Sequence, residues 1–527
     1  MNIFHIKIKY FFAIFIVGFI FSAPVSGHRN LRCVEFIPQI APQNGAKNAH
    51  YLYKTGNYSK ALDEYLKLPD QYFDDAEINF NIGICYLKTF PREQSLRYLQ
   101  KAWLIDSTAF DSHAYYLGYA YQVNYEFSKA IEYYLYHLEN EKPAKLQAEK
   151  VKKHIEECDN AMTIMGDTID IDIKNAGEGI NSQAPEYRPI PYRDETILFT
   201  SRRKNAIYEM PDPDDHYFYE KVFVANTSKS GTTVNQATDK DNLNHASLLY
   251  LSNDNIALFY THYRGSGNIR LGEFKNGIVK EQDDLEAINS RFNETSAVLS
   301  RNGDTIYFIS DRRDMGQGGR DIYFAVKREN HQQWTSPVNL GNEINSKYDE
   351  DGVSLSPDGT TLYFSSKGHN TMGGFDIFKV KRMPDGQWGE VKNLGFPVNS
   401  PLDDVFFVHA ESNKAYFSSN RGVSMGDFDI FYADDIKPKP KTVAPPIPVE
   451  PIAIEEDTVI LPVENENKST QGQFTDISIE ITSDDPDSKD NVNVKLQENK
   501  ELKIFLPLNE KGEIDVVIEE FKENGKN

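Results

Sequence analysis

A repeated unit constrains the fold of this chain more than any other feature. Its starts are marked by an Asn, most often in an Asn-Ser pair, and Asn181, Asn235, Asn289, Asn345 and Asn399 stand 54 to 56 residues apart. An aromatic strand follows each start. In the last three copies a Gly-rich turn and an Asp-Ile-aromatic strand come next. Four short strands at such a period are typical of the blades of a β-propeller.

One copy shows how a blade would be built. Three strands are predicted at Gly352–Ser356, Thr361–Ser366 and Asp376–Val380. The turn Ser-Pro-Asp-Gly joins the first two, because proline fixes one turn dihedral and glycine supplies a positive φ. A fourth strand is expected in the segment that starts at Trp388 and leads to the next Asn-Ser.

The way in which the ring closes can also be predicted. After the fifth aromatic strand the chain gives Asp429–Ala433 and then becomes rich in proline, so the last blade lacks a fourth strand. We expect Thr168–Asn175, which precedes the first repeat, to supply it. The prediction is an all-β propeller of five blades over residues 166–435, with six blades as the alternative if residues 204–240 contain another.

The amino terminus has the pattern of a signal peptide, predicted over residues 1–27. Lys7 and Lys9 precede the apolar run Tyr10–Phe21, and small residues follow at Val25–Gly27. The sequence therefore predicts export, with an uncleaved membrane anchor as the alternative. The net charge of −22 argues against a nucleic-acid partner, because phosphates would be repelled.

Residues 28–162 are predicted to form helical hairpins. Gly83 and Gly118 occupy matching places in two units, and small residues there would let paired helices approach closely. This pattern resembles tetratricopeptide repeats, which implies an all-α solenoid. The segment from Pro143 to Met162 reads as a longer helix that caps the solenoid.

Two further segments are predicted after the propeller. Residues 436–463 are a proline-rich linker, which favours an extended chain without a core. Residues 464–527 form a small acidic β domain of sandwich-like character. Its alternating strands are expected at Phe474–Thr482, Asn491–Leu496, Leu502–Leu508 and Ile514–Glu520.

The three cysteines are Cys33, Cys85 and Cys158, so an exported chain leaves at least one of them unpaired. Cys85 lies in the apolar row of a helix and reads as a core residue. A Cys33–Cys158 disulfide is the pairing to test. No residue is predicted to bind a metal or a cofactor, since neither CxxC nor clustered histidines occur.

Residues repeated once in each blade are candidates for structure rather than for chemistry. Asp321, Asp376 and Asp429 recur at one place in the repeat, and we expect each carboxylate to fix a turn through backbone N–H groups or a nearby Arg. The repeated Asn residues are assigned the same kind of role. An active site would break the repeat, because chemistry needs different groups in one place. No catalytic residue is predicted.

The repeat resembles the WD40-like propeller repeats of the TolB type. Ser310-Asp311-Arg312 with Asp321 carries the pattern, and Ser419-Asn420-Arg421 with Asp429 repeats it. The second blade departs most, since Thr261-His262-Tyr263 stands where the Ser-Asp-Arg element is expected. The resemblance covers about half of the chain and implies the propeller fold.

The order of the predicted parts is similar to that of the periplasmic OmpA-family proteins of Bacteroidetes-type bacteria, some of them associated with type IX secretion and gliding. The helical repeats, Asn181–Arg203 and His154–Met162 carry this resemblance. It implies a periplasmic or outer-membrane-associated protein with protein partners in the envelope. The peptidoglycan-binding OmpA domain of that family has no counterpart here, so direct peptidoglycan binding is not expected.

From these features the sequence predicts a non-enzymatic envelope scaffold that binds protein partners through its helical groove and a propeller face. An asymmetric group of acids at the hub of the ring would contradict this. The alternative is a carbohydrate-binding or glycoside-processing propeller, with two or three carboxylates in a central pocket. An accessory role in outer-membrane nutrient uptake is a third, weaker reading.

Overall fold

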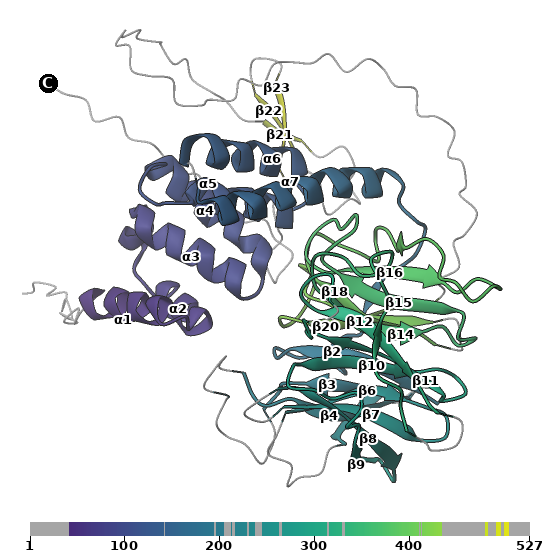
Figure 1. Cartoon of the computed structure of the whole chain (residues 1–527). Helices are drawn as coiled ribbons and strands as arrows, with labels where there is room; N and C mark the ends of the chain where they lie inside the picture. Colours follow the sequence, from purple (N-terminus) through teal and green to yellow (C-terminus); the bar gives the residue numbers. More distant parts are fainter. Residues whose placement is uncertain are drawn as a thin grey trace, which may run out of the picture. The chain divides into compact units, whose positions relative to one another are not determined.

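The computed structural model describes residues 42–434 with short gaps, and three strands beyond them (Figure 1). The gaps are residues 142, 194–195, 205–211, 213–216, 229–230, 238–244, 263–265, 314–315, 329–332, 411 and 413. The predicted signal peptide, Cys33 and the predicted linker lie outside the described residues. The chain divides into two compact units, Met1–Thr442 and Val443–Asn527.

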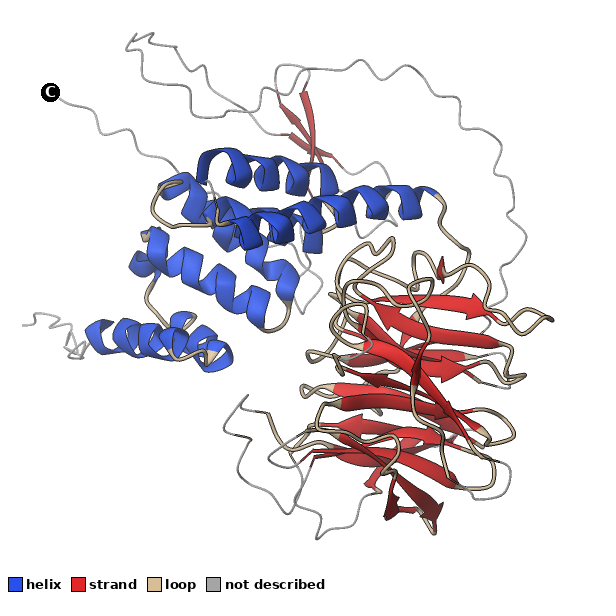
Figure 2. Ribbon diagram, viewed as in Figure 1, coloured by secondary structure: helices blue, strands red, loops and turns tan. Residues whose placement is uncertain are grey.

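The amino-terminal part of the first unit is helical (Figure 2). Within the described residues its α-helices are α1 (Pro42–Lys54), α2 (Tyr58–Tyr65), α3 (Ala76–Lys88), α4 (Ser95–Ile105), α5 (His113–Val123), α6 (Phe127–Tyr136) and α7 (Lys145–Gly166). None of the helices in the described part of the chain is both long and apolar enough to span a membrane.

Glycines allow the helices to approach in pairs. A Cβ at Gly83 of α3 would lie 2.5 Å from Leu99 Cγ of α4, and one at Gly118 of α5 would lie 2.8 Å from Tyr134 Cδ1 of α6. Larger residues would therefore force each pair apart. Asp75 caps the start of α3 by accepting a hydrogen bond from Ile78 N at 3.0 Å.

The second part of this unit is a five-bladed β-propeller, and each blade is a four-stranded antiparallel sheet. The first four blades are β2 (Glu186–Tyr192), β3 (Thr196–Ser201), β4 (Lys221–Ser228) and β5 (Gly231–Gln236); β6 (His245–Leu251), β7 (Ile256–His262), β8 (Asn268–Lys275) and β9 (Ile278–Asp284); β10 (Glu294–Leu299), β11 (Thr305–Ser310), β12 (Asp321–Val326) and β13 (Val338–Asn339); and β14 (Glu350–Leu355), β15 (Thr361–Ser366), β16 (Asp376–Lys381) and β17 (Lys392–Asn393).

The fifth blade takes its outer strand from the segment that precedes the ring. It consists of β18 (Asp404–His409), β19 (Ala415–Ser419), β20 (Asp429–Ala433) and β1 (Lys174–Asn175). In the register Asn175 pairs with Phe431. The strand thus lies within the segment 168–175 predicted for it. The alternative of six blades is wrong, because residues 221–236 form the outer two strands of the first blade.

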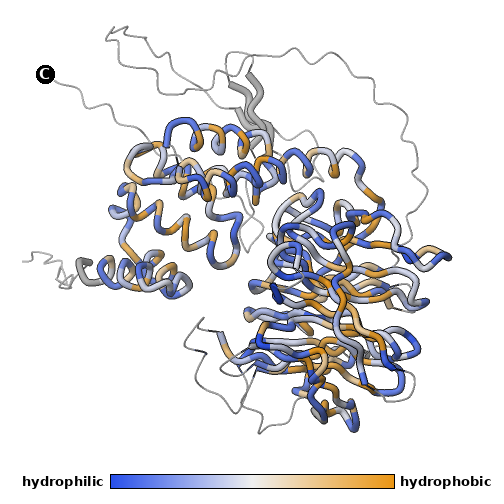
Figure 3. Tube along the Cα trace, in the orientation of Figure 1, coloured by the Kyte–Doolittle hydropathy of each residue, from blue (hydrophilic) through white to orange (hydrophobic). Residues whose placement is uncertain are grey.

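The apolar core lies between neighbouring blades, since Val298 and Ile309 of the third blade share a buried cluster with Phe364 of the fourth. The strands of the propeller carry many apolar residues, drawn in orange in Figure 3. The second strand of every blade places a phenylalanine there, because alternate residues of a strand point to the same face. These rings are almost fully buried, which stabilises the fold by about 1.5–3 kcal/mol each. They are Phe199, Phe259, Phe308, Phe364 and Phe417.

The helical part contacts the loops of the fourth and fifth blades. Arg92 Nη2 lies 2.6 Å from Asp427 Oδ1, and Asn160 Nδ2 donates to Thr371 O at 3.0 Å. Met372 and Leu402 of the propeller share an apolar cluster with the helices. Polar and apolar contacts together therefore join the two parts of this unit.

The second unit contains an antiparallel sheet of β21 (Glu480–Thr482), β22 (Val492–Leu496) and β23 (Lys500–Ile504). The strand predicted at 514–520 lies outside the described residues. In the first unit Cys85 and Cys158 are both buried, and burial raises the pKa of both thiols, that of Cys85 to about 12. Since Cys33 is not among the described residues, the Cys33–Cys158 pairing stays a prediction.

Candidate functional site at the hub of the propeller

The innermost strand of most blades begins with a buried carboxylate that holds the blade together. In the third blade Glu294 Oε1 accepts hydrogen bonds from Ser290 Oγ at 2.7 Å, Ser310 Oγ at 2.8 Å and Arg312 Nη2 at 2.9 Å. Glu186, Glu350 and Asp404 occupy the same position in the first, fourth and fifth blades. Repetition of one network in four blades points to a structural role.

The Asn residues singled out in the sequence lie near the joints between blades. Asn345 Nδ2 donates to Ile322 O at 3.0 Å, while Asn345 Oδ1 accepts from Ile322 N at 2.8 Å. The same pairing with an isoleucine backbone is made by Asn181, Asn289 and Asn399. Asn235 differs, because it lies within β5 opposite Val224.

The repeated aspartates lie next to tight turns. Asp321 Oδ2 accepts from Gln317 N at 2.5 Å and from Asn339 Nδ2 at 3.0 Å, and burial raises the pKa of this carboxyl group. Asp376 and Asp429 make the corresponding bonds in their blades. The structure brings none of these residues together at the hub, so they form no common site.

The repeat is broken in the second blade. His245 stands opposite His262 in the register, where the third blade pairs Glu294 with Ser310. Two acids from the long connection between β3 and β4 flank this imidazole. Asp212 Oδ2 lies 2.9 Å from Nε2 and Glu220 Oε2 lies 3.3 Å from Nδ1.

These contacts determine the charges of Glu220 and His245. Burial alone would raise the pKa of Glu220, but hydrogen bonds from His245 and Tyr187 outweigh it and lower that pKa to about 2. Burial would lower the pKa of His245, whereas its two carboxylate neighbours raise it above the usual value. The arrangement therefore favours an ionised Glu220 beside a protonated imidazole.

A chain of contacts crosses the channel of the ring and takes a residue from each blade. Arg188 of the first blade donates from Nη1 to Ser247 Oγ of the second at 3.1 Å and from Nη2 to Thr295 O of the third at 2.9 Å. Its Cζ lies 4.4 Å from the centroid of the Phe406 ring in the fifth blade. Thr295 Oγ1 in turn donates to Asp351 Oδ1 of the fourth blade at 3.3 Å. We call these five residues the belt.

The belt coincides with bulges in the innermost strands. Arg188 and Phe406 have φ values of 54° and 57°, in the left-handed region that L side chains rarely adopt. Gly352, at the matching place in the fourth blade, has a φ of 63°. Each lies where the register of its strand shifts. Strained backbone of this kind is often found at binding and catalytic sites.

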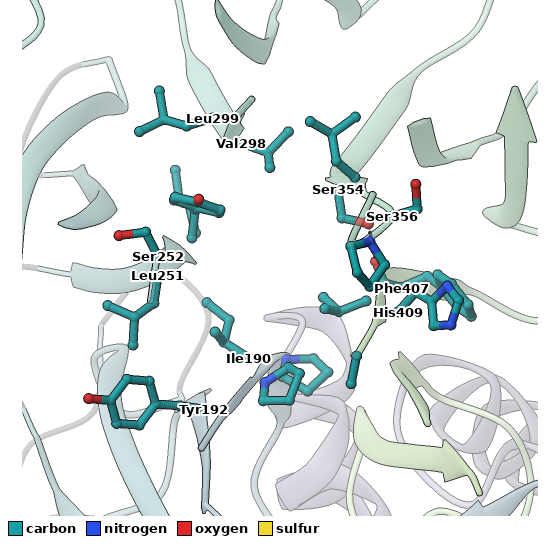
Figure 4. A pocket seen from close by; sticks show the side chains of 18 of the residues that line it. Ile190, Tyr192, Leu251, Ser252, Val298, Leu299, Ser354, Ser356, Phe407 and His409 are labelled. Atoms are coloured by element: carbon teal, nitrogen blue, oxygen red, sulfur yellow. Dashed lines mark hydrogen bonds between the residues drawn. The ribbon is translucent and has the colours of Figure 1, made fainter. Parts of the chain in front are cut away.

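A pocket of about 710 Å³ occupies the channel, with Arg188 and Phe406 among its lining residues. Figure 4 shows apolar side chains around it, including Tyr192, Leu251 and Phe407, with His409 on the side of the fifth blade. The only carboxylate among its described lining residues is that of Asp254, which lies exposed in a turn.

Further charged residues contact the belt outside this pocket lining. Asp351 Oδ2 lies 2.6 Å from Arg320 Nη1. Burial raises the pKa of the nearby Tyr260 to about 12, with Glu220 adding to the shift and Arg188 opposing it. Three acids, a histidine and two arginines near the innermost strands thus depart from the repeat. Sequence reasoning missed this group, and its only signal was the departure of the second blade around His262.

Comparisons with known proteins give matches among solved structures alone. No family model matches the chain. No curated protein matches it either. One similar structure is an alpha-L-arabinofuranosidase from Lactobacillus brevis, with 12% identity and a TM-score of 0.32 over 51% of this chain and 93% of that one. Another is an endo-arabinanase from Bacillus licheniformis, with 10% identity and a TM-score of 0.31 over 49% and 95%. A puromycin hydrolase has 12% identity and a TM-score of 0.25 over 49% and 40%.

The prediction of a non-enzymatic scaffold is therefore wrong. Each of the three solved structures named above carries the name of an enzyme in its title. The scaffold prediction also required a ring without an asymmetric group of acids at its hub. Asp212 and Glu220 form an asymmetric pair of acids around His245, because the second blade has this histidine in place of a structural carboxylate and so departs from the repeat.

Proposed function

We propose that the protein is a carbohydrate-binding propeller whose ligand occupies the pocket in the channel of the ring. The observation that supports this most is the pocket itself. Its volume of about 710 Å³ lies within the usual range for small-ligand sites of about 300–1,000 Å³. Residues of all five innermost strands line it, so a ligand there would contact every blade.

The lining has the mixed character that a sugar ring requires. The C–H faces of a sugar pack on apolar and aromatic surfaces, and Tyr192, Leu251 and Phe407 offer such surfaces. The hydroxyl groups of a sugar need donors and acceptors at fixed places. Arg188, Ser252 and Ser356 place such groups in the same lining.

A glycan array followed by calorimetric titration of the best oligosaccharide tests this proposal. Leu355→Trp places a bulky ring in the pocket lining and is expected to reduce binding at least tenfold. Val338→Trp is the matched control, because Val338 is 48% exposed on an outer strand away from the pocket. Absence of glycan binding by the unaltered protein, or equal binding by the two variants, would contradict the proposal.

Glycoside processing is the second candidate. Glu220 and Asp351 favour it as acids that do not follow the repeat, although neither is among the described residues that line the pocket. Glycosidases with two carboxylates need one of them ionised, and its contacts with His245 and Tyr187 hold Glu220 in that form. Hydrolysis of the bound oligosaccharide would be followed by release of reducing ends. Glu220→Gln and Asp351→Asn are each expected to abolish it, whereas Glu343→Gln, an exposed loop change, is not.

We also infer export of the chain and a tetratricopeptide arrangement of its helices. The pattern of Lys7, Lys9 and the apolar run after them supports export. The close pairing of α3 with α4 and of α5 with α6 supports the helical repeat. Amino-terminal sequencing of the protein from the cell envelope would test the first, with residue 28 as the expected start.

A further inference from the structure

Among the described residues of the pocket lining, the charged ones are mostly cationic. Arg188, Arg193 and Arg301 line the pocket, against one described carboxylate, that of Asp254. His409 adds a group that is cationic when protonated. A local excess of positive charge is unexpected in a chain with a net charge of −22. It identifies the pocket as a place where an anionic group would be favoured.

Several other arginines of the ring are paired with carboxylates. Arg312 Nη2 lies 2.9 Å from Glu294 Oε1, and Arg203 Nη2 lies 3.0 Å from Glu186 Oε1. Arg421 is bonded to Asp404 in the same way. Within the part of the chain that the structure describes, Arg188 forms no ion pair. Its two hydrogen bonds go to a hydroxyl and a carbonyl oxygen, which are neutral acceptors.

Arg188 also retains donor capacity. A guanidinium carries five N–H donors, and its Nε is buried without a hydrogen-bond partner among the described residues. Ser247, Thr295 and the ring of Phe406 hold the side chain in place. A cation that is already positioned loses little conformational entropy when it binds a carboxylate, so this geometry suits an anion.

We propose that the pocket takes an acidic saccharide, one whose sugar rings carry carboxylates, with Arg188 as the residue that binds a carboxylate. This rests on the proposed carbohydrate-binding function and specifies its ligand class. Arg301 and Arg193 are exposed at the rim of the lining and would attract the negative charge of the ligand. The apolar wall would contact the C–H faces of the same rings.

The test compares acidic oligosaccharides with their neutral counterparts. Calorimetric titration of the full chain would use trimers of galacturonate, mannuronate and glucuronate, and the carboxyl-reduced form of each. At least one acidic trimer is expected to bind about tenfold more tightly than its reduced form, since a charge-assisted hydrogen bond is worth about one order of magnitude in affinity. This difference should shrink as the salt concentration rises.

Variants then test whether the preference for acidic trimers arises in the pocket. Arg188→Gln should remove most of the preference for the acidic trimer. Arg301→Gln should reduce the preference. Because Arg301 is exposed, this variant is expected to fold even if Arg188→Gln does not. Arg291→Gln is the control, since Arg291 is exposed on the same propeller but absent from the pocket lining, and it should leave the preference unchanged.

The outcomes separate this inference from the function on which it rests. If reduced trimers or other neutral glycans bind as tightly as the acidic trimers, the acidic class is wrong and carbohydrate binding stands. If no glycan of either kind binds, the proposed function itself is wrong. A preference for the acidic trimer that survives both Arg188→Gln and Arg301→Gln would overturn the assignment to this pocket.

Discussion

Asn175 Nδ2 lies 2.7 Å from Asp429 Oδ2, and this contact joins the strand before the ring to the last strand within it. Asn175 Oδ1 also accepts from Gly177 N at 2.7 Å and from Asn181 Nδ2 at 2.8 Å. Asn339 makes the same three bonds inside a continuous blade. The closing strand β1 therefore copies the outer strand of an ordinary blade.

This equivalence predicts the effect of removing the amide. Asn175→Ala should lower the free energy of unfolding by about 1–3 kcal/mol, because it leaves partly buried polar groups without partners. Asn339→Ala should cost a similar amount, and Asn342→Ala, an exposed loop change, should cost almost nothing. Urea denaturation of the three variants checks this. A loss at Asn175 far smaller than at Asn339 would mean that β1 does not close the ring.

Glu350 predicts a dependence of stability on pH. Its blade has no arginine at the position of Arg312, and His369 Nε2 instead contacts the carbonyl oxygen of Ile344 at 3.0 Å. Burial therefore raises the pKa of Glu350 to about 8, from about 4.3 in the unfolded chain. The folded state holds a proton that the unfolded state releases. The associated stability is complete below pH 4.3 and is lost as the pH rises to about 8.

Thermal unfolding at a series of pH values checks this expectation. Glu350→Gln cannot ionise, so its melting temperature should fall less than that of the unaltered protein between pH 5 and 8. Glu343→Gln lies in an exposed loop of the same region and should follow the unaltered protein. Parallel curves for Glu350→Gln and the unaltered protein would rule out a proton on this carboxyl group.

The belt predicts that Arg188 stabilises the ring. Arg188→Ala removes two hydrogen bonds and the contact with Phe406, and should lower the free energy of unfolding by about 1–3 kcal/mol. Arg188→Lys keeps the charge but has one donor group, so an intermediate loss is expected. Arg291→Ala is the exposed control. Chemical denaturation measures all three, and no loss for Arg188→Ala would show that the belt is energetically neutral.

The contact between Arg92 and Asp427 predicts energetic coupling of the helices to the fifth blade. Their side chains are 12% and 22% exposed, so a double-mutant cycle should give a coupling of about 1–3 kcal/mol. The exposed pair Lys101 and Asp74, at 46% and 86%, should give about 0–1 kcal/mol. Equal coupling in the two cycles would argue against a stabilising role for the first pair.

The sequence predicted the parts of the fold that repeat and missed the parts that do not. Periodic strands and the Ser-Pro-Asp-Gly turn are local signals, and the shortfall of one strand after Asp429 was enough to assign Thr168–Asn175. The site depends on contacts between distant segments, such as Arg188 with Thr295 O across 107 residues. No spacing along the chain encodes that approach.

The second blade did carry a usable signal. The sequence showed that Thr261-His262-Tyr263 departs from the repeat, and a departure is where chemistry is expected. The sequence could not predict that Asp212 and Glu220 contact His245, because both acids come from a connection of irregular length in another blade. The loss of the repeated carboxylate at the position of His245 was therefore a signal in the sequence for the place where the site lies.

The belt also has a mechanical consequence. The belt takes one residue from each of the five innermost strands and so links all the blades at the centre of the ring. The ring itself is closed at one seam, the pairing of β1 with β20. A molecule held by Arg188 would resist separation of the blades, and the seam between β1 and β20 would open less often while the hub is occupied. Hydrogen exchange at Phe431, far from the ligand along the chain, would then report occupancy of the hub.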